Sequence, residues 1–196
     1  MLEKGVVSLV RKYAIEHSGK DDIHGYSHTE RVYELSLQIG KKLDANLFIV
    51  EIAALLHDIG RKNKNETTSS KNHAELSADM ASNFLNSYDF KLSQEEVDNI
   101  IHCIRAHSFS NNIVPETLEA KILSDADKLD ALGAIGIYRT IVFTLKKQGG
   151  IPQVIEHLEN KILKLKDLLH LDITRKMAED RQQIILDFYN KIKKEK

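Results

Sequence analysis

Apolar residues recur every three or four positions along most of the chain, the spacing of a helix with one buried face. No alternating apolar and polar run of useful length predicts a strand, and two prolines and nine glycines leave few breaks. The fold class is therefore expected to be all-α. The predicted helices span residues 2–17, 28–44, 46–59, 73–88, 94–108, 115–131, 133–148, 151–170 and 173–194.

Several predicted helices begin at a capping box, in which a polar side chain and a glutamate three residues later satisfy amides of the first turn. The boxes are Ser27 with Glu30, Asn72 with Glu75, and Ser93 with Glu96. Pro115 suits the first turn of a further helix, because its ring already holds the helical φ angle.

The segment 47–59 is apolar nearly all round, so its helix is expected at the centre of a bundle. The polar segment 61–72 follows it and could form a lid over a site or a mobile linker. We expect residues 1–150 to form the helical core. Residues 151–196 contain two long amphipathic patterns and predict a helical hairpin packed on that core or on a second subunit.

Charge and composition narrow the classes of partner. The chain carries 28 basic and 29 acidic residues, which argues against general nucleic-acid or membrane binding. No apolar stretch approaches the ~20 residues of a membrane span. The single cysteine, Cys103, excludes an intramolecular disulfide and suits a reducing compartment. A cytoplasmic location is therefore expected.

The adjacent pair His57–Asp58 ends the most apolar predicted helix. A histidine and a carboxylate are expensive to bury unless they are paired or bind a cation. The pair is thus a candidate metal site. In the alternative interpretation, Asp58 pairs with Arg61 or Lys62 at the helix end and His57 bonds a carbonyl group.

Two further segments contain candidate ligands. His28 follows the predicted cap at Ser27, and Asp125 and Asp127 lie in a run with three carboxylates. Helical spacing does not decide between the two aspartates. Either aspartate could instead form an ordinary salt bridge with a neighbouring lysine.

The order of these elements resembles the H…HD…D pattern of the HD superfamily of metal-dependent phosphohydrolases, and most closely its YedJ-like branch. The elements are His28, then Leu-Leu-His57-Asp58-Ile-Gly-Arg, then Asp-Ala-Asp127-Lys-Leu-Asp-Ala-Leu-Gly. The resemblance runs from about residue 20 to 145. It implies an HD-domain helical bundle, here with a C-terminal long-helix extension. It also implies a divalent ion held by His28, His57, Asp58 and Asp127, which favours Asp127 over Asp125.

The implied activity is hydrolysis of a phosphate ester by metal-activated water. His57 and Asp58 would carry the catalysis, with Asp58 orienting or deprotonating the water. Mn²⁺, Mg²⁺, Fe²⁺, Ni²⁺ and Zn²⁺ all remain candidates, with one or two ions per chain. The substrate would be a nucleotide or another small phosphorylated metabolite, and the protein could be a homodimer. The alternatives are an HD-type di-iron oxygenase and a non-catalytic module that binds a nucleotide or a metal.

The remaining polar candidates have weaker support. His73 and His107 resemble the extra histidines that support a second metal in some HD proteins. They could equally contact a substrate phosphate or bond within the core. Lys62 and Lys128 directly follow the ligand motifs and could bind a phosphate or balance nearby carboxylates. His24 is expected at a helix end or on the surface.

Overall fold

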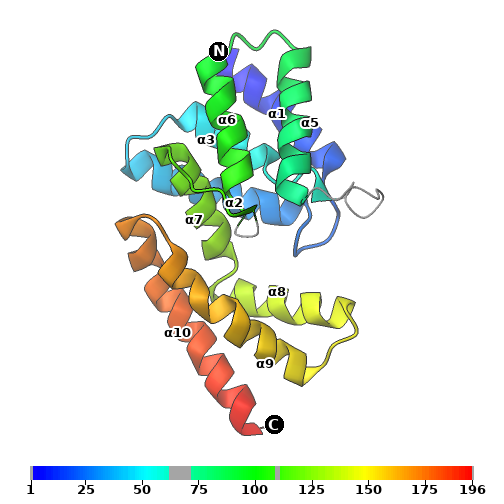
Figure 1. The fold of residues 1–196 in the computed structure, drawn as a ribbon, viewed down its shortest axis with the longest axis vertical. Helices are drawn as coiled ribbons and strands as arrows, with labels where there is room; N and C mark the ends of the chain where they lie inside the picture. Colours follow the sequence, from blue (N-terminus) through cyan, green and yellow to red (C-terminus); the bar gives the residue numbers. More distant parts are fainter. Residues whose placement is uncertain (1, 62–71, 109–110, 196) are drawn as a thin grey trace. The chain divides into compact units, whose positions relative to one another are not determined.

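The structure, a computed structural model, describes residues 2–61, 72–108 and 111–195 (Figure 1). Within these residues the regular structure is helical apart from one isolated bridge between Gly19 and Gly25, so the predicted all-α class is confirmed. The chain divides into two compact units, Met1–Ser124 and Asp125–Lys196.

The first unit is built around its third helix. Its helices are α1 (Leu2–His17), α2 (Tyr26–Lys42), α3 (Leu47–Leu56), α5 (His73–Ser87), α6 (Gln94–Ala106) and the first half of α7 (Leu118–Asp130). Helix α3 packs against α1, α2, α5 and α6, and every side chain from Ile52 to Leu56 is fully buried. The all-round apolar pattern correctly predicted this central position.

Two of the predicted caps are present. Glu96 N donates to Ser93 Oγ at 3.3 Å and Ser93 N donates to the Glu96 carboxylate at 2.8 Å, which completes a capping box at the start of α6. Asn72 accepts from Glu75 N at 3.0 Å and caps α5. The Glu75 carboxylate does not return to the cap, because Arg105 of α6 donates to it at 3.1 Å.

The cap predicted at Ser27 is wrong. Helix α2 begins at Tyr26 after Gly25, with no side-chain cap. The Glu30 carboxylate instead accepts from the guanidinium of Arg11 on α1 at 2.7 Å. The Glu30 carboxylate therefore forms a long-range ion pair with Arg11, and not the capping box that local spacing predicted.

Pro115 also lies outside the helix predicted for it. Helix α7 begins at Leu118, and Ala120 N donates to the hydroxyl of Thr117 at 3.2 Å. The threonine thus acts as the cap, and the proline precedes it in a segment without regular secondary structure.

The second unit contains the rest of α7, then α8 (Gly133–Lys146), α9 (Ile151–Asn160), the 3₁₀ helix η2 (Ile162–Leu168) and α10 (Asp172–Glu195). The continuous helix predicted over 151–170 is wrong, because α9 ends before Lys161, whose φ of −131° is not helical. In a 3₁₀ helix residues three apart share one side, and Ile162 and Leu165 are both buried.

The division between the units falls inside α7, earlier than the boundary at residue 150 expected from the sequence. The packing of residues 151–196 on the core stays a prediction. Among the described helices, none combines the length and the apolar character needed to cross a bilayer.

Candidate metal centre

The His57–Asp58 pair follows α3 in the interior of the first unit. The exposed fraction of the surface is 0% for His57 and 3% for Asp58. His57 Nδ1 lies 2.7 Å from the carbonyl oxygen of Ala54. Because a carbonyl oxygen only accepts, Nδ1 carries the proton, and in the neutral imidazole Nε2 then carries the lone pair. The backbone of α3 thus orients His57 as a ligand through Nε2.

Gly60 allows this turn to lie directly against α5. Its N–H donates to Ser77 Oγ at 2.9 Å. A Cβ atom at this position would lie 2.5 Å from the backbone nitrogen of Ser77. Only a glycine permits such a close approach of two backbones. The approach brings the start of α5, and with it His73, towards Asp58.

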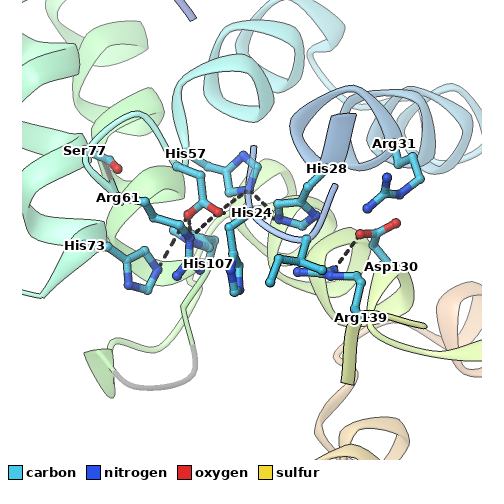
Figure 2. A network of polar contacts seen from close by, with 12 residues as sticks. His24, His28, Arg31, His57, Arg61, His73, Ser77, His107, Asp130 and Arg139 are labelled. Carbon is cyan, nitrogen blue, oxygen red and sulfur yellow. Dashed lines mark hydrogen bonds and ion pairs between the residues drawn. The ribbon is translucent and has the colours of Figure 1, made fainter. Parts of the chain in front are cut away.

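A first group of possible ligand atoms combines Asp58 Oδ2 with His28 and His57. His28 Nε2 lies 3.5 Å and His57 Nε2 3.7 Å from this oxygen, and the two Nε2 atoms are 3.4 Å apart. Figure 2 shows the rings of these two histidines close together. All three side chains are buried. His28 comes from the first turn of α2, so this group joins α2 to the end of α3.

A second group surrounds the other oxygen of the same carboxylate. His73 Nε2 lies 3.6 Å and His107 Nε2 3.5 Å from Asp58 Oδ1. His107 Nδ1 lies 2.6 Å from the carbonyl oxygen of Ile104, which leaves the lone pair on Nε2, as in His57. Asp58 therefore stands between two groups, each with two histidines.

The chemistry of these atoms fits a divalent cation. The Nε2 lone pairs of His57 and His107 face carboxylate oxygens, so acceptors face acceptors. Among the described residues, the buried atoms Asp58 Oδ1 and His107 Nε2 have no hydrogen-bond partner. Protonating all four imidazoles would gather a large positive charge in the interior. Imidazole and carboxylate together suit Mn²⁺, Fe²⁺ or Zn²⁺, and each group could hold one ion.

Asp58 also forms an ion pair with Arg61, whose Nε contacts Oδ2. Burial alone would raise the pKa of the Asp58 carboxyl, but Arg61, the two histidines His57 and His107, and then His73 hold this pKa well below its usual range. The carboxylate is thus ionised at neutral pH. The ion pair proposed in the alternative interpretation of the sequence therefore coexists with the histidine cluster.

The two aspartates that helical spacing could not separate have different surroundings. The Asp125 carboxylate is fully buried and accepts from His170 N at 2.9 Å, Leu171 N at 3.0 Å and Thr174 Oγ1 at 2.6 Å. These bonds anchor the start of α10, so Asp125 has a structural role. Asp127 lies on α7 within the second unit, and its role as a metal ligand stays a prediction.

The two candidate phosphate-binding lysines are less informative. Lys62 lies outside the described residues, as does segment 62–71 of the predicted lid. Lys128 is buried in the second unit, and burial lowers the pKa of its ammonium group against the attraction of Asp125 and Asp127. Phosphate binding by Lys128 stays a prediction.

His24, expected at a helix end or on the surface, precedes the start of α2 and lies beside the site. Its ring centroid is 6.4 Å from that of His28, and the side chain is labelled next to the cluster in Figure 2. Asp21 Oδ1 accepts from Ile23 N and His24 N, both at 3.0 Å, and shapes the loop that presents the ring. Helical periodicity could not find His24, because the residue precedes α2.

Comparison with known proteins gives one family for this chain. The model of the HD domain matches residues 25–132. YpgQ, an uncharacterized protein of Bacillus subtilis, is 34% identical over 184 residues, which cover 88% of this chain and 84% of that protein. The crystal structure of Bacillus subtilis YpgQ in complex with ADP is similar at 30% identity, covering 100% of this chain and 97% of that one, with a TM-score of 0.80.

An HD-superfamily hydrolase from Bacillus thuringiensis is also similar, at 27% identity over 98% of this chain and 97% of that chain, with a TM-score of 0.75. The likeness to the YedJ-like branch stays a prediction. The matched region contains His28, both halves of the His57–Asp58 pair, His73, His107 and Asp127. The chain therefore belongs to the HD domain family.

Proposed function

We propose that this protein hydrolyses a phosphate ester of a nucleotide or another small phosphorylated metabolite, and that it depends on a divalent metal ion. One observation carries the proposal. A fully buried carboxylate, Asp58, faces the Nε2 atoms of four histidines, two of which are held by backbone carbonyls in the tautomer that leaves a lone pair on Nε2. Such an arrangement is stable when a cation lies between the facing acceptors.

We assign the first ion to His28, His57 and Asp58, with Asp127 as the fourth ligand. The family pattern supports Asp127, and the structural bonds of Asp125 support it further by removing its rival. A second ion would take His73, His107 and the other oxygen of Asp58. The buried Oδ1 and His107 Nε2, which lack a hydrogen-bond partner among the described residues, support this second position.

A divalent ion held here would neutralise charge on phosphoryl oxygens and lower the pKa of water, so that hydroxide is available at neutral pH. The residues of the chain supply the positioning. The carbonyl groups of Ala54 and Ile104 hold the rings of His57 and His107, and the low pKa of Asp58 keeps its carboxylate able to accept a hydrogen bond from water.

The nucleotide part of the proposal rests on the relative that was solved with ADP. For the phosphate groups we propose Lys62 and Lys128 as contacts, since each directly follows a ligand motif in the sequence.

A phosphate-release screen tests this function. Nucleotides and phosphorylated metabolites are incubated with metal-stripped protein resupplied with Mn²⁺, Mg²⁺, Fe²⁺ or Ni²⁺. We expect turnover that requires the added metal and is lost in His57→Ala. His102→Ala is the matched control, because His102 accepts from Glu116 N on an exposed part of α6. Turnover by metal-free protein, or by His57→Ala at the wild-type rate, would refute the proposal.

The same metal-stripped and resupplied protein distinguishes the proposed hydrolase from the two alternatives, a di-iron oxygenase and a non-catalytic binding module. A di-iron oxygenase would consume oxygen with iron loaded and release no phosphate with Mn²⁺ or Mg²⁺. A non-catalytic module would bind a nucleotide tightly and turn over none of the substrates with any metal.

A further inference from the structure

A cation from the chain already lies at the oxygen that the first metal ion would use. Arg61 Nε contacts Asp58 Oδ2, the oxygen that lies 3.5 Å from His28 Nε2 and 3.7 Å from His57 Nε2. Arg61 Nε donates its hydrogen bond to this oxygen, whereas the buried Oδ1 has no hydrogen-bond partner among the described residues. The guanidinium therefore neutralises Asp58 on the side of the first ligand group.

The two partners differ in burial. The Asp58 side chain is 1% exposed, whereas the Arg61 side chain is 28% exposed. A buried carboxylate needs a compensating cation, so removal of Arg61 from Oδ2 requires a replacement. A side chain that is more than a quarter exposed can turn towards solvent without leaving the edge of the site, because only three positions separate it from Asp58.

A divalent ion at the first group and the guanidinium at Oδ2 would share one oxygen and repel each other at short range. We propose that Arg61 is the counterion that the divalent ion displaces from Asp58, and that the displaced guanidinium then binds the phosphate group of the substrate. This inference rests on the proposed function and adds an order to it, in which the metal binds first and the phosphate second.

The charges support this order. Without metal, one guanidinium balances one carboxylate and leaves no surplus for an anion. With a divalent ion bound, the site gains two positive charges and the guanidinium becomes available. The planar guanidinium can then form two parallel hydrogen bonds to phosphate oxygens. A phosphate group has the negative charge and the paired oxygens that such a site can bind.

The first test is calorimetric titration of metal-stripped, full-length protein with Mn²⁺. We expect Arg61→Ala to bind Mn²⁺ roughly three- to tenfold more tightly than wild type, because it lacks the competing ion pair. Arg61→Lys keeps the positive charge and should remain near wild type. The control is Arg105→Ala, since Arg105 pairs with Glu75 and not with Asp58.

The second test measures binding of inorganic phosphate to the Mn²⁺-loaded proteins. Arg61→Ala should bind phosphate about tenfold more weakly or worse, and Arg61→Lys severalfold more weakly, because lysine cannot form the paired bonds. Tighter metal binding combined with weaker phosphate binding is a signature that a purely structural arginine would not give. Should Arg61→Ala fail to fold, the phosphate affinity of Arg61→Lys decides.

Unchanged or weaker Mn²⁺ binding by Arg61→Ala would overturn the displacement, and unchanged phosphate binding would overturn the phosphate contact. In either case, metal-dependent turnover by wild type would leave the proposed function standing. Wild-type protein that binds no Mn²⁺ and releases no phosphate with any of the metals would overturn both proposals.

Discussion

His107 Nε2 lies 3.5 Å from Asp58 Oδ1, and within the described residues neither buried atom has a hydrogen-bond partner. The two residues belong to different helices, because Asp58 follows α3 and His107 follows α6. Packing of α6 against α3 therefore creates this pair. Because this pair belongs to the second ligand group, mutation of His107 tests whether the protein binds one ion or two.

His107→Ala should lower the metal content by one ion per chain and leave the first ion in place. His107 Nε2 lies 3.5 Å from Oδ1, whereas His28 Nε2 of the first group lies 3.5 Å from Oδ2. Elemental analysis of protein purified in Mn²⁺ measures the content, with His102→Ala as the control. An unchanged metal content would show that His107 is a core histidine and not a ligand.

The aspartates of α7 should separate into a structural residue and a ligand. Asp125→Asn weakens the bonds to His170, Leu171 and Thr174, and we expect it to lower the free energy of unfolding by about 3 kcal/mol. Asp127→Asn should change stability little and weaken Mn²⁺ binding about tenfold or more. Denaturant unfolding and metal titration measure the two effects. The reverse result would assign the ligand to Asp125.

Gly60→Ala should destabilise the protein by about 1–3 kcal/mol, because the added Cβ would lie 2.5 Å from Ser77 N. It should also weaken metal binding, since the shifted turn carries Asp58. Gly5→Ala on α1 is the control, because its Cβ would meet nothing within 4 Å and alanine favours a helix. Equal denaturation midpoints for the two variants would contradict the close approach of the turn to α5.

Cys103 should contribute a pH-dependent part of the stability. Burial, and next the nearby Glu119, raise the pKa of this thiol from 9.0 to about 12. The folded state holds the proton more tightly, so the contribution is complete below pH 9 and is lost as the pH rises towards 12. Between pH 7 and pH 10 the free energy of unfolding of wild type should fall by about 1.4 kcal/mol more than that of Cys103→Ala. Urea unfolding at the two pH values measures this difference.

Alkylation gives an independent check of the same thiol. At pH 8.5 the native protein should react with iodoacetamide only as fast as it unfolds, since the buried thiol is protonated. Unfolded protein should react at the rate of a free cysteine. Rapid modification of native protein would show that Cys103 is accessible and ionised.

The sequence by itself determined the helical class, the central place of α3 and the candidate ligands. These features depend on local patterns, because helical periodicity and the apolar surface of segment 47–59 are visible in a short window. The burial of His57–Asp58 follows from the same pattern, since the pair continues the most apolar helix. Family resemblance then connected that pair to His28 and Asp127.

Only the tertiary structure decided which atoms meet. The approach of His73 and His107 to one oxygen of Asp58 depends on how separate helices pack, whereas the contact of Arg61, three residues from Asp58, was already among the pairs that sequence spacing offered. The role of Asp125 likewise depends on α10, which begins more than forty residues later. Sequence spacing predicts which side chains lie close together only within a single helix. Contacts between residues of different helices depend on how those helices pack.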